Sequence, residues 1–146
     1  GLAYRPRIAH PTLAAAFEDV IRACSELDEG PWLPPNIIAG YKQLHGLGWA
    51  HSFEAWTADG TLAGGLYGLG IGALFGAESM FFRVSEASKV AMIAMVEHAR
   101  RIGIELIDVQ VLTPHTMRMG AVEIARGEYL QLLGEAAGRE VDWRDG

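Results

Sequence analysis

Glycine alternates with large apolar residues along Gly64–Phe81, which reads GGLYGLGIGALFGAESMF. Within this stretch, GLGIGA at Gly68–Ala73 matches the G-x-G-x-x-G/A pattern of dinucleotide-binding loops. That interpretation needs a helix to begin at the last glycine, because the helix N-terminus receives the pyrophosphate, and no capped helix follows here. The alternation has the period of a β-strand instead, where glycine marks a bulge or the close approach of another backbone or a ligand. We therefore predict a glycine-rich strand pair rather than a phosphate-binding loop.

The length of 146 residues suits one domain with a substantial core, and we expect residues 1–146 to form it. No apolar run reaches the roughly 18 residues of a spanning helix, so we expect a soluble protein without a membrane partner. Cys24 is the single cysteine, which excludes an internal disulfide, and no signal-peptide pattern opens the chain, which favours the cytoplasm. The formal charge of −6 has the wrong sign for gripping long stretches of nucleic-acid backbone.

Apolar residues at three- and four-residue spacing predict an amphipathic helix over Pro11–Ser25. A second helix is expected over about Asn36–His45, where Gly46 and Gly48 stop it, and a final helix over Arg126–Leu133. Ser85 or Ser88 can cap another helix that runs to about Ile102, and Gly103 fits the left-handed position that ends it. Pro114 is expected to begin a short helical turn.

Alternating patterns predict the strands. They cover Ala50–Thr57, Thr61–Tyr67, Ala73–Phe75 and Glu105–Val111. In the last of these, ELIDVQV, successive side chains point to opposite faces, so Asp108 and Gln110 share one face. A carboxylate there is costly to bury unless it is paired, so Asp108 belongs either to a structural network or to a site. Glu78 raises the same question.

Other residue types give weaker indications of chemistry. Met92 and Met95 lie on a predicted helix, where they form core packing or line an adaptable apolar pocket. The five histidines show no metal-type spacing with one another or with Cys24, so we expect no metal site. A nucleophile elbow and a Walker loop are both absent from the sequence.

Seven strings in order resemble the leucyl/phenylalanyl-tRNA–protein transferase family of bacteria. They are PWL at Pro31–Leu33, YKQLHGLGWAHSFEAW at Tyr41–Trp56, GGLYG at Gly64–Gly68, FGAESMF at Phe75–Phe81, EASK at Glu86–Lys89, LIDVQ at Leu106–Gln110 and TPHTMRMGAVEIAR at Thr113–Arg126. The likeness covers about Phe17 to Leu133. It implies an α/β (α+β) GNAT-like acyltransferase domain, a mixed sheet flanked by helices, which uses no acetyl-CoA and no other cofactor.

The resemblance also implies an activity and its residues. Members transfer Leu or Phe from aminoacyl-tRNA to an N-terminal Arg or Lys of acceptor proteins, which marks these proteins for degradation. The counterparts of Asp108 and Gln110 assist peptide-bond formation with that of Glu78 beside them, and the Trp32 counterpart stacks on the terminal adenosine. The implied side-chain pocket consists of Leu66, Phe75, Met80, Met92, Met95, Ala99 and Ile107. We expect a monomer.

The sequence departs from the family pattern in several places. Arg5 and Arg7 are all that remains of a basic cluster, and the usual N-terminal extension is not seen, so tRNA binding should be weaker than is usual in the family. Ala77 and Arg118 replace a glycine and a serine, and Phe82 is expected to narrow or reshape the pocket. Two other functions stay open: a catalytically weak module that binds aminoacyl ends or N-terminal residues, and a small-molecule N-acyltransferase that binds acyl-CoA.

Overall fold

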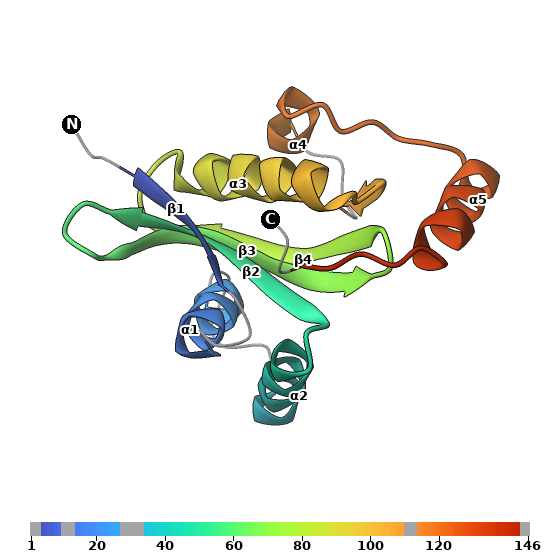
Figure 1. Ribbon diagram of the computed structural model, residues 1–146. Helices are drawn as coiled ribbons and strands as arrows, with labels where there is room; N and C mark the ends of the chain where they lie inside the picture. Colours follow the sequence, from blue (N-terminus) through green and yellow to red (C-terminus); the bar gives the residue numbers. More distant parts are fainter. Residues whose placement is uncertain (1–3, 10–13, 27–33, 110–113, 144–146) are drawn as a thin grey trace.

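The computed structural model describes residues 4–9, 14–26, 34–109 and 114–143, and its centre is a five-stranded sheet (Figure 1). The strands are β1 (Tyr4–Ala9), β2 (Ala50–Thr57), β3 (Leu62–Ile71), β4 (Leu74–Phe82) and β5 (Leu106–Asp108). They lie in sequence order across the sheet. Neighbours from β1 to β4 are antiparallel, whereas β5 pairs with β4 in parallel, so the sheet is mixed as expected.

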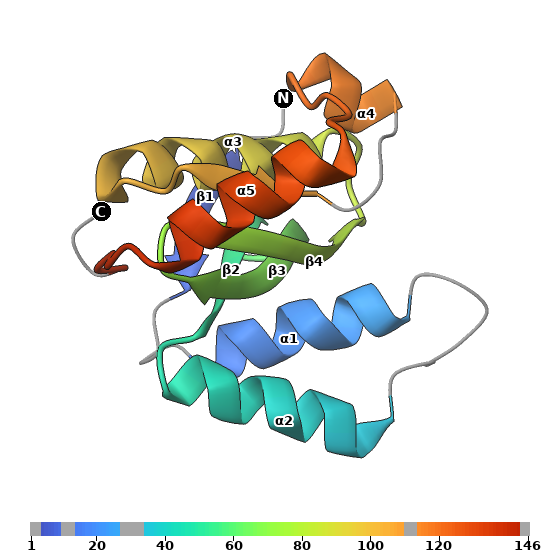
Figure 2. The ribbon, with the colours of Figure 1, turned by 90° about the vertical axis from the view of Figure 1, so that its right-hand side faces the viewer.

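Helices cover both faces of the sheet, as the two views in Figures 1 and 2 show. The helices are α1 (Ala14–Ser25), α2 (Pro35–Gly46), α3 (Ala87–Ile102), α4 (Pro114–Arg118) and α5 (Arg126–Ala137). α1 and α2 pack against one face and α3 crosses the other (Figure 2), and α5 contacts β4 and β5 at the edge of the sheet. None of the helices in the described part of the chain is long and apolar enough to cross a membrane.

Strand alternation builds a separate apolar core on each face of the sheet. Tyr67 of β3 packs in the cluster that holds Phe17 and Ile21 of α1. Its neighbour Leu66 points the other way, into the cluster that holds Met92 and Met95 of α3. The second cluster lies beneath the candidate site.

The glycine-rich stretch forms the β3–β4 hairpin, which confirms the prediction of a strand pair. A Cβ on Gly68 would collide with the carbonyl oxygen of Gly76, so a side chain is excluded there. A Cβ on Gly70 would lie 2.6 Å from Nε1 of Trp143. Gly72 begins the two-residue turn at φ +56°, and its Cβ would lie 2.6 Å from the carbonyl oxygen of Ala136. Close approach of other backbone and of an indole explains these glycines.

Several element boundaries differ from the sequence predictions. β3 extends to Ile71 and β4 to Phe82, because each strand is held by its partner across the hairpin. β1 was not predicted at all; it pairs with β2 at the sheet edge, where Pro6 is tolerated. α5 continues to Ala137, one turn beyond the predicted end.

The ends of α3 give one wrong prediction and one confirmed prediction. Its N-cap is Glu86, at a left-handed φ of 72°, rather than Ser85 or Ser88. Gly103 ends the helix at φ 92°, as predicted, and its N–H donates to the carbonyl oxygen of Ala99. The left-handed conformation at Gly103 is one that glycine adopts without steric cost.

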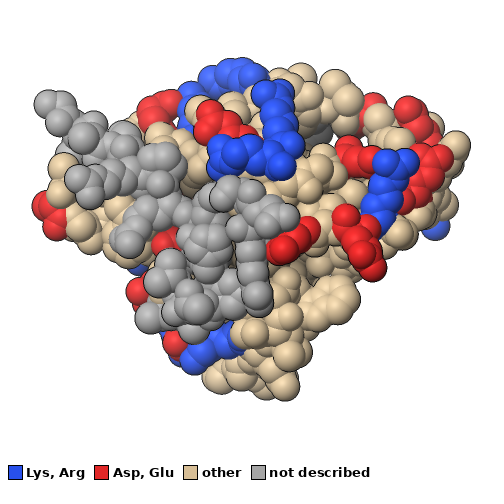
Figure 3. Space-filling view, viewed as in Figure 1, with Lys and Arg blue, Asp and Glu red and all other residues tan. Residues whose placement is uncertain are grey.

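Positive charge on the face drawn in Figure 3 is divided into separate groups, with acidic side chains near them. Some of the cations are engaged within the molecule: Arg22 and Lys42 both pair with Glu18, and Lys89 pairs with Glu86 at 2.6 Å. Such exposed pairs contribute little to stability, but they reduce the positive charge available to an anionic partner.

Candidate active site

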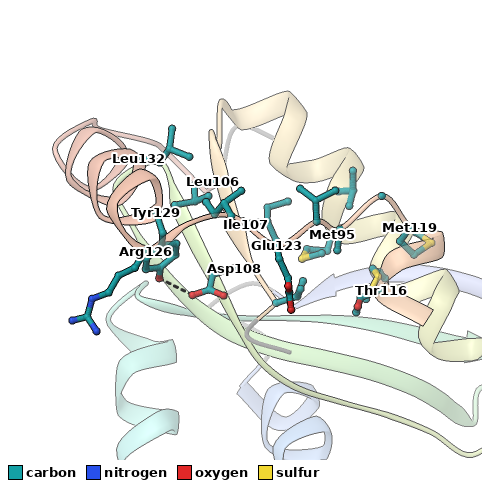
Figure 4. Close-up of a pocket in the computed structure, with 17 residues that line it drawn as sticks. Met95, Leu106, Ile107, Asp108, Thr116, Met119, Glu123, Arg126, Tyr129 and Leu132 are labelled. Carbon is teal, nitrogen blue, oxygen red and sulfur yellow. Dashed lines mark hydrogen bonds between the residues drawn. The ribbon is translucent and has the colours of Figure 1, made fainter. Parts of the chain in front are cut away.

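A cavity of about 730 Å³ lies between α3, β5, α4, residues 119–124 and α5 (Figure 4). Met92, Met95 and Ile107 form its apolar inner wall. Met119 and Leu132 line it from the C-terminal segments. A cavity of this size and character is typical of a site for a small organic group.

Asp108 places a carboxylate on this largely apolar wall. It is the last residue of β5 and is half-buried. The hydroxyl of Tyr129, on α5, donates a hydrogen bond to its Oδ2 at 2.7 Å (Figure 4). This bond is the main cause that raises the pKa of the Tyr129 phenol above its ordinary value. The cavity therefore joins an apolar space to an oriented carboxylate.

The residues implied for the side-chain pocket divide into three groups. Met92, Met95 and Ile107 line the cavity. Leu66, Phe75 and Met80 belong to the same apolar cluster but are not among the described residues that line the space; Leu66 and Phe75 are fully buried and support the lining residues from behind. Ala99 is 2% exposed on α3 and does not line the cavity either.

Glu78 lies at a β-bulge, where the register between β3 and β4 shifts. Gly76 pairs with Asp108 in the parallel ladder, and Glu78 follows Gly76 two residues later on β4. Burial raises the pKa of the Tyr41 phenol, and the nearby negative charge of Glu78 raises it further. Tyr41 and Tyr67 contact each other with ring centroids 5.3 Å apart. Glu78 therefore stands on the α2 side of the sheet and does not line the cavity.

Some sequence-based expectations receive no direct test or are wrong. Gln110 and Trp32 lie outside the described residues. Phe82 is 58% exposed at the end of β4 and does not line the cavity, so the expectation that it narrows the pocket is wrong. Arg118 is exposed, and its Nε donates to the carbonyl oxygen of Pro114 at 3.1 Å.

Sequence reasoning missed the outer wall of the site. Arg126, Tyr129 and Leu132 line the cavity at three-residue intervals along α5, and this spacing was visible in the predicted helix. The sequence did not show that this face docks beside β5. The guanidinium of Arg126 points out of the cavity in Figure 4.

The part of the chain that the structure describes holds no group of three or more His, Cys, Asp or Glu side chains that could bind a metal ion. Asp108 is instead engaged by a phenol. The chemistry that these residues can supply is hydrogen bonding, charge and proton transfer.

Solved structures with a similar fold are acetyltransferases. An aminoglycoside acetyltransferase from an uncultured soil metagenomic sample gives a TM-score of 0.64 at 15% identity, covering 84% of this chain and 94% of its own. A ribosomal-protein-alanine N-acetyltransferase from Brucella melitensis biovar Abortus 2308 gives 0.56 at 15% identity, covering 84% and 96%. The fold is therefore that of the GNAT acetyltransferases, as expected, and at this identity the likeness extends to the fold alone.

Sequence relatives are much closer. A leucyl/phenylalanyl-tRNA–protein transferase from Proteus mirabilis is 53% identical over 122 residues, covering 84% of this chain and 53% of that protein. Its namesake from Herpetosiphon aurantiacus is 50% identical over 121 residues, covering 83% and 62%. The chain thus spans between about half and three fifths of the length of these relatives. The sequence model described as leucyl/phenylalanyl-tRNA protein transferase matches residues 4–134, and the chain belongs to that family.

Proposed function

We propose that this chain transfers Leu or Phe from aminoacyl-tRNA to the N-terminal Arg or Lys of acceptor proteins. The observation that carries the proposal is Asp108, a carboxylate held on the wall of an apolar cavity in a chain of this family. The product would be a protein with a new N-terminal residue, a mark for degradation. The donor, charged tRNA, places the reaction in the cytoplasm.

The chemistry requires a group that accepts a proton. The α-amine of the acceptor attacks the ester carbonyl of the aminoacyl-tRNA; the new N–C bond forms, the ester C–O bond breaks, and the released ribose oxygen takes up a proton. An α-amine has an ordinary pKa of about 7.7 to 8.0 and must be neutral when it attacks. Asp108 orients the amine and receives its proton, directly or through water. Because the ester is already activated, positioning supplies much of the acceleration.

Three further residues complete the proposed site. Gln110, two residues after Asp108, holds the amine or the carboxylate by hydrogen bonds. Glu78, on β4 beside the strand that carries Asp108, offers a carboxylate to the Arg or Lys side chain of the acceptor. Trp32 stacks on the terminal adenosine of the tRNA, which would contribute about 1 to 3 kcal/mol without regard to sequence.

The lining of the cavity suits both Leu and Phe. Met92, Met95 and Met119 are unbranched and flexible, so they adapt to an aliphatic or an aromatic side chain. Discrimination by the size of an apolar group is limited to about 1 to 3 kcal/mol per methylene. Acceptance of the two donors by one pocket is the expected consequence.

Transfer of radiolabelled Leu or Phe from charged tRNA to a peptide that begins with Arg tests the proposal. We expect transfer by the parent chain and a loss of about 10²- to 10⁴-fold in the Asp108→Ala, Gln110→Ala double variant, the usual range for general acid–base catalysis. A peptide that begins with Gly is the control for acceptor recognition. No transfer by the parent chain, at low salt and high protein concentration, would exclude the activity for this chain.

A module that binds aminoacyl ends without turnover is the second candidate, favoured by the formal charge of −6. An aminoacyl-adenosine analogue with a non-hydrolysable linkage separates the two functions. Measurable binding of this analogue together with no turnover of charged tRNA would favour the module, whereas multiple turnovers would exclude it.

A further inference from the structure

Tyr129 touches the carboxylate at the centre of the proposed site, although it lies 21 residues further along the chain, on a different element. Its hydroxyl donates to Oδ2 of Asp108 at 2.7 Å, and its ring lies on the cavity wall (Figure 4). Hydrogen bonds from a hydroxyl to a carboxylate are charge-assisted and stronger than neutral ones. The contact is therefore strong enough to select one orientation of Asp108.

The strand that carries Asp108 is short and lies at one edge of the described sheet. β5 has three residues and pairs only with β4 among the described strands, so backbone pairing alone gives Asp108 little support. α5 is a firm base for the donor: the N–H of Ala73, in the β3–β4 turn, donates to the carbonyl oxygen of Ala136 at 2.8 Å. Tyrosine has only two side-chain torsions, so its hydroxyl loses little freedom in this position.

We propose that Tyr129 is a positioning residue that orients the Asp108 carboxylate toward the incoming α-amine, an inference that rests on the aminoacyl transfer proposed above. The phenol donates one hydrogen bond throughout the reaction and exchanges no proton with the substrate. Asp108 receives the proton of the amine in the orientation that Tyr129 sets.

The protonation state of Tyr129 fits this role. The hydrogen bond to Asp108 raises the pKa of the phenol above its ordinary value, and the acceptor amine becomes neutral at a lower pH, near its own pKa of about 7.7 to 8.0. The hydroxyl therefore still carries its proton at the pH where the amine becomes able to attack. The same hydrogen bond could serve only to hold α5 against the sheet. The experiment must therefore separate an effect on the orientation of Asp108 from an effect on the stability of the fold.

A double-mutant cycle separates them. We expect Tyr129→Phe, which removes one hydroxyl, to lower kcat about 10- to 100-fold, the range for a lost hydrogen bond to a charged group. The KM for charged tRNA should change less than about twofold, because the ground-state contacts remain. In the Asp108→Asn background, Tyr129→Phe should lower kcat less than about twofold, since the charge it orients is gone. The same loss in both backgrounds, or an unchanged kcat in the single variant, would overturn the proposal.

Gln131→Ala is the matched control on the same helix. Gln131 is exposed and donates to Oε1 of Glu135 at 3.5 Å, away from the cavity. We expect this variant to keep the kcat of the parent. A comparable fall in kcat would assign the effect of Tyr129→Phe to a general disturbance of α5.

A crystal structure of the Tyr129→Phe variant tests the proposal without a measurement of activity. In a crystal structure of Tyr129→Phe, we expect the Asp108 carboxylate to rotate away from its parental position or to occupy two conformations. One unchanged conformation would overturn the positioning role, whether or not the parent chain transfers amino acids. Failure of transfer by the parent chain, with a displaced Asp108 in the variant, would instead count against the proposed function and leave the positioning contact established.

Discussion

Cys24 illustrates how burial decides the chemistry of a single residue. The side chain is 2% exposed in the core beneath α1, and burial raises the pKa of its thiol to about 12. We expect no reaction with a thiol reagent at pH 8 in the folded protein and full reaction in denaturant, measured by absorbance of the released chromophore. Rapid labelling of the folded protein would contradict the assigned burial.

The same shift has a consequence for stability. Below the ordinary thiol pKa of 9.0 the folded and unfolded states bind the proton equally, so the contribution of the buried thiol is fully present. As the pH rises from 9 toward 12, the unfolded state loses its proton first, and the free energy of unfolding falls.

Individual glycines show how far local sequence reaches. The alternating pattern predicts a glycine-rich strand pair, which the hairpin confirms. A side chain at Gly70 would collide with the indole of Trp143, which is the last residue of the described chain. A local sequence pattern contains no information about a contact between residues so far apart in the chain, so the role of Gly70 could not be predicted.

At the scale of elements, the turn between β3 and β4 also anchors α5. Gly72→Ala would place a Cβ 2.6 Å from the carbonyl oxygens of Ala136, Ala137 and Arg139, at a φ that alanine disfavours. We expect the free energy of unfolding to fall by about 2 to 4 kcal/mol, from overpacking and from the left-handed backbone, as measured by urea denaturation.

Gly134→Ala supplies the control for this prediction. Gly134 lies in α5, and a Cβ there meets nothing within 4 Å. Alanine should stabilise this helix by about 0.5 to 1 kcal/mol because glycine is the weaker helix former. If Gly72→Ala unfolded at the same urea concentration as the parent, the turn would not be the anchor of α5.

The elements themselves were predicted more securely than their limits. Apolar spacing predicted α1, start and stop signals predicted α2 and α3, and the alternating pattern predicted the β2–β3 hairpin. That pattern cut β3 short at Tyr67, since glycine has low strand propensity and only the partner strand extends the pairing to Ile71. It missed β1, where Pro6 argues against a strand in any position except an edge.

At the scale of the whole molecule, the net charge determines how strongly salt affects the binding of tRNA in the proposed function. With a formal charge of −6, and with basic side chains in separate groups on the face drawn in Figure 3, we expect few phosphates to be neutralised. We expect log K against log salt concentration to have a slope of about −1 to −3 between about 50 and 200 mM salt, because each neutralised phosphate releases about one counterion. Filter binding measures this slope.

A short RNA hairpin with the same 3′ end is the control. It should bind with nearly the affinity of whole tRNA, because the proposed contacts involve the end alone. A slope of about −6 or steeper would show a broad phosphate interface and contradict this prediction.

The part of the site formed by β5 and α3 could be predicted from the sequence. Asp108 and the methionines of α3 follow from strand and helix periodicity together with the family resemblance. The outer half, which includes Tyr129, depends on how α5 docks beside β5, a long-range contact that spacing along one helix does not specify.

The attachment of α5 has one more consequence. Ala136 is the buried residue among the described residues of this helix, and Leu133 packs partly buried in the same cluster, so apolar contacts hold α5 to the sheet near its C-terminal end. Arg126 and Tyr129, which line the cavity, lie toward the opposite end of the helix. The outer wall of the cavity is therefore built on the end of α5 that has fewer buried apolar contacts, where local opening leaves the rest of the fold in place.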